Sequence, residues 1–234
     1  MNKTWLIIIG GVLVVLVAGV AQFFSMRPVA SPFMPTTTAT STIEQNVGTT
    51  TTSIVPTINA NVAPGNPTTH PLPLVQDDTV VSWNFKGAYA DNPELVAKAK
   101  NEIGRLSVQL AIATSSAMIL SVGIANQYEL LGDGTKQYVY LERAVQANPT
   151  NGLPWHNLGV LMERLGALQT ARIAYEKSTL VQSELEFYHY AYIEFLILRM
   201  KDDTVVIEKA FTAAEKNIGQ TPYLLELRAE WKQL

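Results

Sequence analysis

The sequence predicts an all-α protein in which a short array of packed helices follows a transmembrane helix and a disordered stalk. Three observations support this prediction: a long uncharged apolar stretch near the N-terminus, a polar tract with almost no charge, and a C-terminal part in which apolar residues recur every three or four positions. The last spacing marks one face of an amphipathic helix. Apolar and polar residues do not alternate over any comparable run, so strands are not expected.

Residues 1–27 are expected to form a membrane anchor. Residues 5–24 contain no charge, and at about 1.5 Å per residue a helix of this length spans the roughly 30 Å hydrocarbon layer of a bilayer. Lys3, the apolar run and a small residue at Ala21 also fit a cleavable signal peptide. We favour a retained signal anchor because the apolar run continues beyond that point toward Arg27.

The charges at the two ends of the apolar run set its expected orientation. Lys3 and the N-terminal amine lie on one side and Arg27 alone on the other, which favours a cytoplasmic N-terminus. The Thr/Pro-rich tract that follows is typical of extracytoplasmic segments. We therefore expect a single-pass membrane protein whose C-terminal domain is extracytoplasmic.

Residues 28–80 are expected to form a disordered linker. Between positions 28 and 75, Thr, Ser and Pro fill 23 of 48 positions, Glu44 is the only charged residue and Phe33 the only aromatic one. A segment of this composition buries too little apolar surface to offset the entropy lost on ordering. We expect it to act as a spacer between the membrane and a helical domain at residues 81–234.

The helical domain repeats itself at an offset of 34 residues, with two helices per unit joined by a glycine turn. Before the repeat, Asn92, Pro93 and Glu94 predict the start of an amphipathic helix over 93–111. In the first helix of the two units, Ile124, Ala125, Tyr128, Glu129, Leu131 and Gly132 correspond to Leu158, Gly159, Met162, Glu163, Leu165 and Gly166; in the second, Leu141 and Ala144 correspond to Tyr175 and Ser178.

The repeated residues resemble the tetratricopeptide repeat (TPR), a family whose helix pairs stack into an α-solenoid. The residues with a structural role in this resemblance are Ala125, Tyr128, Pro149, Trp155, Leu158, Gly159, Ala171 and Tyr175. The match extends over about residues 118–184. Within it, Gln137 replaces a small residue of the second helix, Met162 replaces a tyrosine, and Ser183 replaces the closing proline.

A third unit over about residues 186–219 fits the repeat loosely. Its second-helix residues Ile207, Phe211 and Ala214 are two positions out of the 34-residue register. Pro222 then begins a final helix that is expected to cap the stack, which gives a short TPR-like α-solenoid of about seven helices.

Composition and spacing argue against several classes of function. A net charge of −3 provides no basic surface for nucleic acid. The absence of cysteine excludes disulfides and thiolate metal sites, and the three histidines do not stand at metal-ligand spacing. No nucleophile with a partnered base is apparent. We therefore expect no catalytic residue, cofactor or metal, and a chain that is not an enzyme.

The resemblance implies that the first helix of each unit lines a groove that binds a protein or peptide partner. The residues expected to contact the partner there are Asn126, Glu129, His156, Asn157, Val160, Glu163, Arg164 and Tyr190. Asn126 and Asn157 stand where peptide-binding members of the family place asparagines that hold a peptide backbone. Both could equally be ordinary solvated residues.

These features lead to the expectation of a membrane-tethered scaffold that binds a partner protein through the groove of its repeats. Two alternatives remain open at this point. Cleavage at Ala21 would give a secreted binding protein, and stacking between repeat domains would give a structural subunit of a cell-envelope or surface assembly.

Overall fold

The computed structural model describes residues 72–234 of the chain. The expected membrane helix and the linker as far as residue 71 lie outside the described residues. Among the helices of residues 72–234, none is both long and apolar enough to cross a bilayer. The all-α prediction is confirmed, because the regular structure of residues 72–234 is helical apart from an antiparallel bridge between Asn84 and Asp133.

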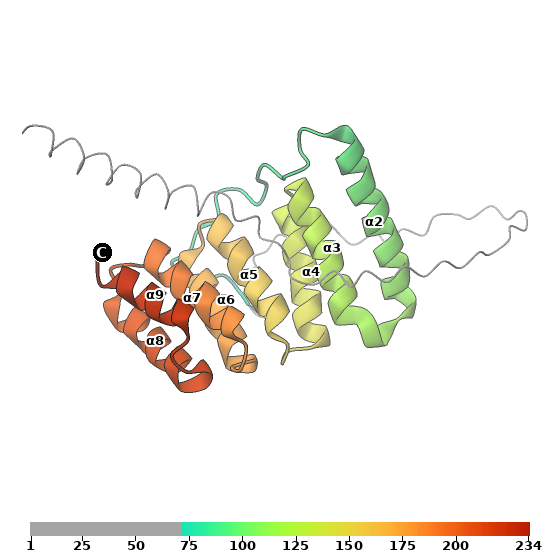
Figure 1. The fold of residues 1–234 in the computed structure, drawn as a ribbon. Coiled ribbons are helices and arrows are strands. Elements are labelled where there is room, and N and C mark those ends of the chain that lie inside the picture. The colour runs from blue at the N-terminus through green and yellow to red at the C-terminus, as the bar shows by residue number, and fades with distance from the viewer. Residues whose placement is uncertain (1–71) are drawn as a thin grey trace, which may run out of the picture. The chain divides into compact units, whose positions relative to one another are not determined.

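Eight α-helices follow one another in the described part of the chain, where the sequence predicted about seven (Figure 1). They are α2 (Pro93–Ile112), α3 (Ala117–Leu131), α4 (Gly134–Ala147), α5 (Gly152–Arg164), α6 (Leu168–Val181), α7 (Glu186–Arg199), α8 (Thr204–Ile218) and α9 (Pro222–Trp231), with a short 3-10 turn at Thr114–Ser116. Each helix packs against the next one in the sequence. The contacts are most extensive within two pairs, α3 with α4 and α5 with α6, which we call unit one and unit two.

Helix α2 begins where the sequence predicted. The Asn92 side chain accepts hydrogen bonds from the backbone N–H groups of Glu94 and Leu95, at 3.1 and 3.2 Å, and Pro93 occupies the first helical position. These features satisfy N–H groups that have no partner within the helix. Ala99, Leu106 and Leu110 are buried on one face, so the predicted amphipathic helix is confirmed.

The 34-residue offset is visible in the backbone of units one and two. Gly132 and Gly166 end the first helix of each unit in the left-handed conformation, with φ of 80° and 79°. The hydrogen bonds around them also correspond: Gly132 N to Glu129 O and Asp133 N to Tyr128 O in unit one, and Gly166 N to Glu163 O and Ala167 N to Met162 O in unit two. Glycine is favoured at both turns because it adopts a positive φ without steric cost.

A second correspondence links unit two to the helix that follows it. The Trp155 Nε1 atom donates to the Pro149 carbonyl at 3.0 Å, and the His189 Nε2 atom is hydrogen-bonded to the Ser183 carbonyl at 2.9 Å. In both cases the ring nitrogen is bonded to a carbonyl six residues earlier in the sequence. Trp155 and His189 are 34 positions apart, and so are Pro149 and Ser183. Ser121 holds the equivalent position in unit one, where its hydroxyl group is buried and has no hydrogen-bonding partner among residues 72–234.

The close approach of α5 and α6 depends on a glycine facing an aromatic ring. A Cβ atom at Gly159 would lie 2.9 Å from the Tyr175 ring, closer than real Cβ contacts allow. In unit one the equivalent residues are Ala125 and Leu141, both fully buried. Each unit therefore combines a small first-helix residue with a larger second-helix residue, as close helix packing requires.

Residues 72–92 pack against the helical units before α2 begins (Figure 1). Leu72 is 3% exposed and belongs to the hydrophobic core. The backbone of Asn84 pairs with Asp133. The sequence placed the end of the disordered linker at residue 80, whereas residues 72–80 belong to the packed domain. Buried leucine and long-range hydrogen bonds hold them there despite their linker-like composition.

The C-terminal helix α9 packs on α7 and α8 through both polar and apolar contacts. The Arg228 guanidinium is paired with Glu208 of α8 at 2.8 Å and with Glu215 at 3.0 Å, and it lies over the Phe211 ring at 4.4 Å. The expected second-helix residues of the third unit, Ile207, Phe211 and Ala214, are all buried in α8.

Candidate functional site

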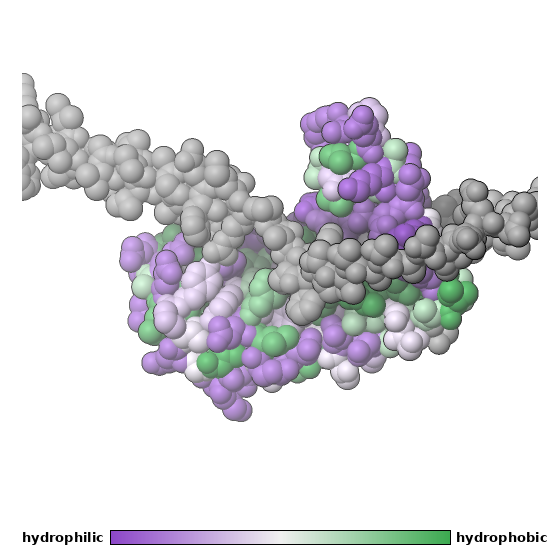
Figure 2. Space-filling model, turned by 45° about the vertical axis from the view of Figure 1, so that its right-hand side comes forward, coloured by the Kyte–Doolittle hydropathy of each residue, from purple (hydrophilic) through white to green (hydrophobic). Residues whose placement is uncertain are grey.

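The residues expected to meet a partner come from the first helices α3, α5 and α7, and we call their positions the first-helix face. Asn126 and Glu129 lie on α3, Tyr190 lies on α7, and the remaining five lie on α5: His156, Asn157, Val160, Glu163 and Arg164. All except His156 retain solvent exposure in the described structure. On the side shown in Figure 2, hydrophilic and hydrophobic residues are intermixed over the coloured surface.

Two ion pairs connect the first helices of successive units. Arg164 Nη2 of α5 lies 2.8 Å from Glu129 Oε1 of α3, and Arg199 Nε of α7 lies 2.8 Å from Glu163 Oε1 of α5. Both pairs are partly exposed, so each is expected to contribute at most about 1 kcal/mol to stability. Their main consequence is positional, because they fix where charge stands along the face.

Glu163 also accepts a hydrogen bond from a core residue of unit two. The Tyr175 hydroxyl group donates to Glu163 Oε2 at 3.0 Å. Burial raises the pKa of Tyr175, and the nearby Glu163 carboxylate adds to that rise. Tyr175 therefore remains a neutral donor at physiological pH, and Glu163 is held by one bond from the core and one from α7.

Asn126 and Asn157 differ from these charged residues. Both are partly exposed, on α3 and α5, and within residues 72–234 neither side-chain amide forms a hydrogen bond. A side-chain amide has an NH2 donor, which suits the C=O group of a peptide unit, and a C=O acceptor, which suits its N–H group. Within the described residues, both side chains therefore keep a donor and an acceptor that no other protein group uses.

His156 stands apart from the rest of the face because it is only 6% exposed. Its ring lies among Tyr175 of α6 and Phe187 and Tyr188 of α7, with ring centroids 5.5, 4.7 and 5.8 Å away. The Nδ1 atom is buried, and no residue in the described part of the chain forms a hydrogen bond with it. Burial lowers the pKa of His156 to about 4. In this structure the residue contributes to packing between units two and three and offers little surface to a partner.

Tyr190 joins the face to the C-terminal helix. Its hydroxyl group is hydrogen-bonded to Thr221 at 2.5 Å and to Glu186 at 2.9 Å. Its ring meets the ring of Tyr223 at right angles, with centroids 5.0 Å apart, and the Tyr223 hydroxyl group is hydrogen-bonded to Glu194 of α7. The start of α9 therefore bounds the face at this end.

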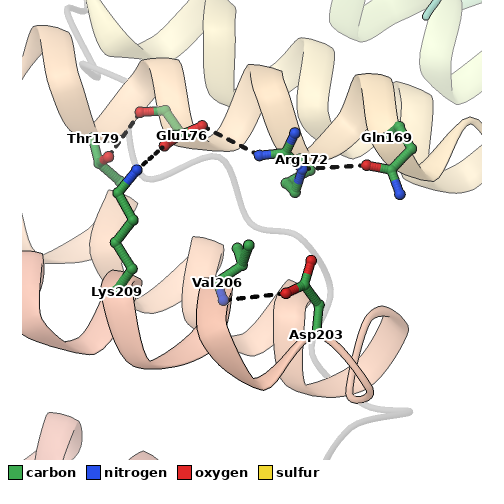
Figure 3. Close-up of polar contacts among 7 residues, drawn as sticks. All are labelled: Gln169, Arg172, Glu176, Thr179, Asp203, Val206 and Lys209. Carbon is green, nitrogen blue, oxygen red and sulfur yellow. Dashed lines mark hydrogen bonds and ion pairs between the residues drawn. The ribbon is translucent and has the colours of Figure 1, made fainter.

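The second helices α6 and α8 carry polar contacts of their own (Figure 3). Glu176 of α6 lies 3.4 Å from Arg172 on the same helix and 3.8 Å from Lys209 of α8. Ion pairs between neighbouring units thus occur on both rows of helices, and they do not by themselves mark a binding surface.

Two features of the first-helix face were missed by sequence reasoning. Arg199, which pairs with Glu163, was not among the residues that the sequence predicted for the face. Phe85, whose ring lies 4.7 Å from the Arg164 guanidinium, precedes the repeat altogether. An arginine at the end of a first helix was an available signal for the former. Phe85 belongs to an aromatic cluster with Trp83 and Tyr89 in the sequence, but no spacing connects that cluster with Arg164.

The described residues provide no cluster of three His, Asp or Glu side chains that could hold a metal ion. No protein-family model matches this chain, and no curated protein or solved structure is significantly similar to it.

Proposed function

We propose that this chain is a membrane-tethered scaffold of the TPR type that binds an extended segment of a partner protein along the first-helix face. The repeat assignment is supported by the 34-residue recurrence of the left-handed glycine turns at Gly132 and Gly166 and of the small residues that face the second helix. Sequential packing of helix pairs is the arrangement that solenoid repeats use.

The observation that carries the binding proposal is the pair of uncommitted amides at Asn126 and Asn157. They stand on the first helices of adjacent units, and the charged residues around them are already paired with one another. A partner segment would therefore be recognised mainly through its backbone amides and apolar side chains. A strongly charged segment would have to compete with the existing ion pairs.

The test is partner capture followed by affinity measurement with substituted chains. Asn126→Ala combined with Asn157→Ala removes both amides, and the loss of two hydrogen bonds should weaken binding by roughly 5- to 150-fold. Thermal unfolding should change little, because substitutions at such surface positions typically alter stability by less than about 0.5 kcal/mol.

The matched control is Asn101→Ala combined with Asn217→Ala. These asparagines are exposed on α2 and α8, away from the first-helix face, so partner affinity should be unchanged. If both double variants retain full affinity for every captured partner, binding through the first-helix face is refuted.

The membrane tether is a separate part of the proposal. We infer that residues 5–24 stay attached and that the helical domain is extracytoplasmic. N-terminal sequencing of the mature protein distinguishes this arrangement from secretion, since cleavage after Ala21 would leave a chain that begins at Gln22.

A further inference from the structure

Residues 72–78, which we call the strap, lie against the second helices of units one and two. Leu72 inserts its side chain into the hydrophobic core, and its carbonyl accepts a 2.7 Å hydrogen bond from the Tyr138 hydroxyl group of α4. These two residues are 66 positions apart in the sequence. The contact therefore joins the segment that follows the linker to the interior of unit one.

Thr170 of α6 is the centre of the strap's polar contacts. Its side chain is fully buried, and its hydroxyl group accepts a hydrogen bond from Val75 N at 3.0 Å and donates one to Asp78 Oδ2 at 2.6 Å. One hydroxyl group thus binds a backbone donor and a carboxylate acceptor that are three residues apart on the strap.

Asp78 completes the N-terminus of α6. The residue at the N-cap position is Ala167, which has no side chain able to cap the helix. Asp78 supplies this function instead, since its carboxylate accepts hydrogen bonds from Gln169 N at 3.2 Å and Thr170 N at 2.6 Å. A carboxylate is favoured there by the N–H groups and by the helix dipole. The neighbouring Asp77 is exposed.

The residues after the strap are held in a different way. In the 83–89 segment the backbone is bonded to the glycine turn of unit one, with Phe85 N to Gly132 O at 3.1 Å and Tyr89 N to Leu130 O at 3.0 Å. A Cβ atom at Gly87 would lie 2.3 Å from the Leu130 carbonyl oxygen, so this segment fits only as a fixed part of the fold. Between it and the strap, Val81 is 96% exposed and Thr79 and Ser82 are also exposed.

We propose that the strap is a tethered ligand: an acidic segment of the form Leu-x-x-Val-x-x-Asp that occupies a docking site on α4 and α6 and can leave it while the helices remain folded. The site consists of the core residues against which Leu72 packs, the hydroxyl groups of Tyr138 and Thr170, and the N-terminal N–H groups of α6. Its occupant in the resting chain is the chain's own residues 72–78. This proposal is independent of binding at the first-helix face.

The first test measures binding in trans to the full chain in a mild detergent. In the released chain, Leu72→Asp and Asp78→Ala remove the two anchors of the strap, and the probe is a fluorescent peptide of residues 70–80. We expect the released chain to retain its helical circular dichroism and to bind the peptide, while the wild-type chain binds it at least about tenfold more weakly because its site is filled.

Peptide variants then test the chemistry of the site. A peptide with Asp78→Asn should bind the released chain at least about tenfold more weakly, because charge-assisted hydrogen bonds contribute more than neutral ones. A peptide with Asp77→Asn should bind like the original. A released chain that is folded but does not bind the peptide, or that binds all three peptides equally, overturns the proposal. So does a released chain that is unfolded, since the strap would then be an integral part of the fold.

Hydrogen exchange in the unmodified chain provides a second measurement. The N–H group of Val75 donates from the strap to Thr170, and the N–H groups of Gln169 and Thr170 donate to Asp78 on the strap. These three N–H groups should exchange at least about tenfold faster than N–H groups in the middle of α6. Equal exchange rates for the two sets would mean that the strap leaves only when the domain unfolds, and would contradict the proposal.

Discussion

Units one and two share a backbone design but fill it with different side chains. The left-handed glycine and its two hydrogen bonds occur in both. At equivalent interior positions, however, unit one has Ser121 and Gln137 where unit two has Trp155 and Ala171. Unit one thus buries two polar side chains that have unpartnered oxygen atoms, and unit two buries an indole ring that donates to Pro149.

The difference between the units agrees with where the N-terminal residues attach. Trp83 packs its ring 5.2 Å from Tyr138, and its carbonyl accepts a hydrogen bond from Gly134 N, so the 83–89 segment adds contacts to unit one. Unit two receives the Asp78 cap on α6. Chain that lies outside the repeat thus adds contacts to both units, through different residues. The turns and small residues keep the 34-residue register in both units, while the side chains that fill the interior differ between them.

The largest expected effect comes from emptying the position at which the units differ most. Trp155→Ala should lower the free energy of unfolding by roughly 3–5 kcal/mol, because it removes a ring that is 7% exposed and leaves a cavity. Ser121→Ala at the equivalent position should change stability by less than about 1 kcal/mol, since its hydroxyl group has no partner to lose. Urea denaturation of both variants measures the contrast. Similar losses would show that the two positions are equally important.

Acid should destabilise unit two through His156, whose counterpart in unit one is the buried Val122. The folded-state pKa of His156 is about 4, below its unfolded value of 6.5, so the folded chain binds fewer protons between these values. The stabilising effect of keeping the ring neutral is complete above pH 6.5 and is lost progressively as the pH falls from 6.5 to 4. The loss by pH 4.5 should be roughly 2–3 kcal/mol.

The matched chain for this measurement is His156→Phe, which keeps an aromatic ring in the same cluster and cannot be protonated. Carboxylates also titrate in this range, so the informative quantity is the difference between the two chains in unfolding free energy from pH 7.5 to 4.5. If both chains lose the same amount, His156 is not the acid-sensitive group.

Giving unit two the Ala–Leu pair of unit one tests whether a small first-helix residue must face a large second-helix residue. Gly159→Ala should destabilise the domain by about 1–3 kcal/mol, because the added methyl group would lie 2.9 Å from the Tyr175 ring, which Glu163 holds in place. Adding Tyr175→Leu recreates the Ala–Leu pair of unit one and should recover part of the loss. Gly104→Ala is the control, since no atom lies within 4 Å of the added methyl group. Additive losses in the double variant would argue against a coupled pair.

Much of the fold could be predicted because its signals are local. The Asn92 cap and Pro93 fixed the start of α2, and the 34-residue offset located the turns at Gly132 and Gly166. The burial of Ile207 and Phe211 followed from their spacing even though the third unit is out of register.

The parts that escaped prediction depend on contacts between distant residues. Asp77 and Asp78 add charge that the preceding linker almost wholly lacks, but no local pattern indicates that residues 72–80 pack on the helices, because their partners lie 66 to 95 positions away. His156 stands on the expected face of its own helix, but Phe187 from α7, the first helix of the next unit, covers it. The pattern of a single repeat cannot reveal which of its exposed positions the next repeat will bury.

The smallest expected effect concerns Gln137, which is 2% exposed and whose Oε1 atom has no hydrogen-bonding partner within the described residues. Unit two has Ala171 at this position, so the amide is not required by the repeat geometry. Gln137→Leu keeps a side chain of similar length and removes the buried oxygen, and we expect it to stabilise the domain by about 1 kcal/mol. Gln146→Leu, at an exposed position of the same helix α4, should change stability by less than about 0.5 kcal/mol. Urea denaturation measures the free energy of unfolding of both variants. A loss of stability in Gln137→Leu would mean that the amide makes a stabilising contact, and that unit one is less compromised than its unpartnered atoms indicate.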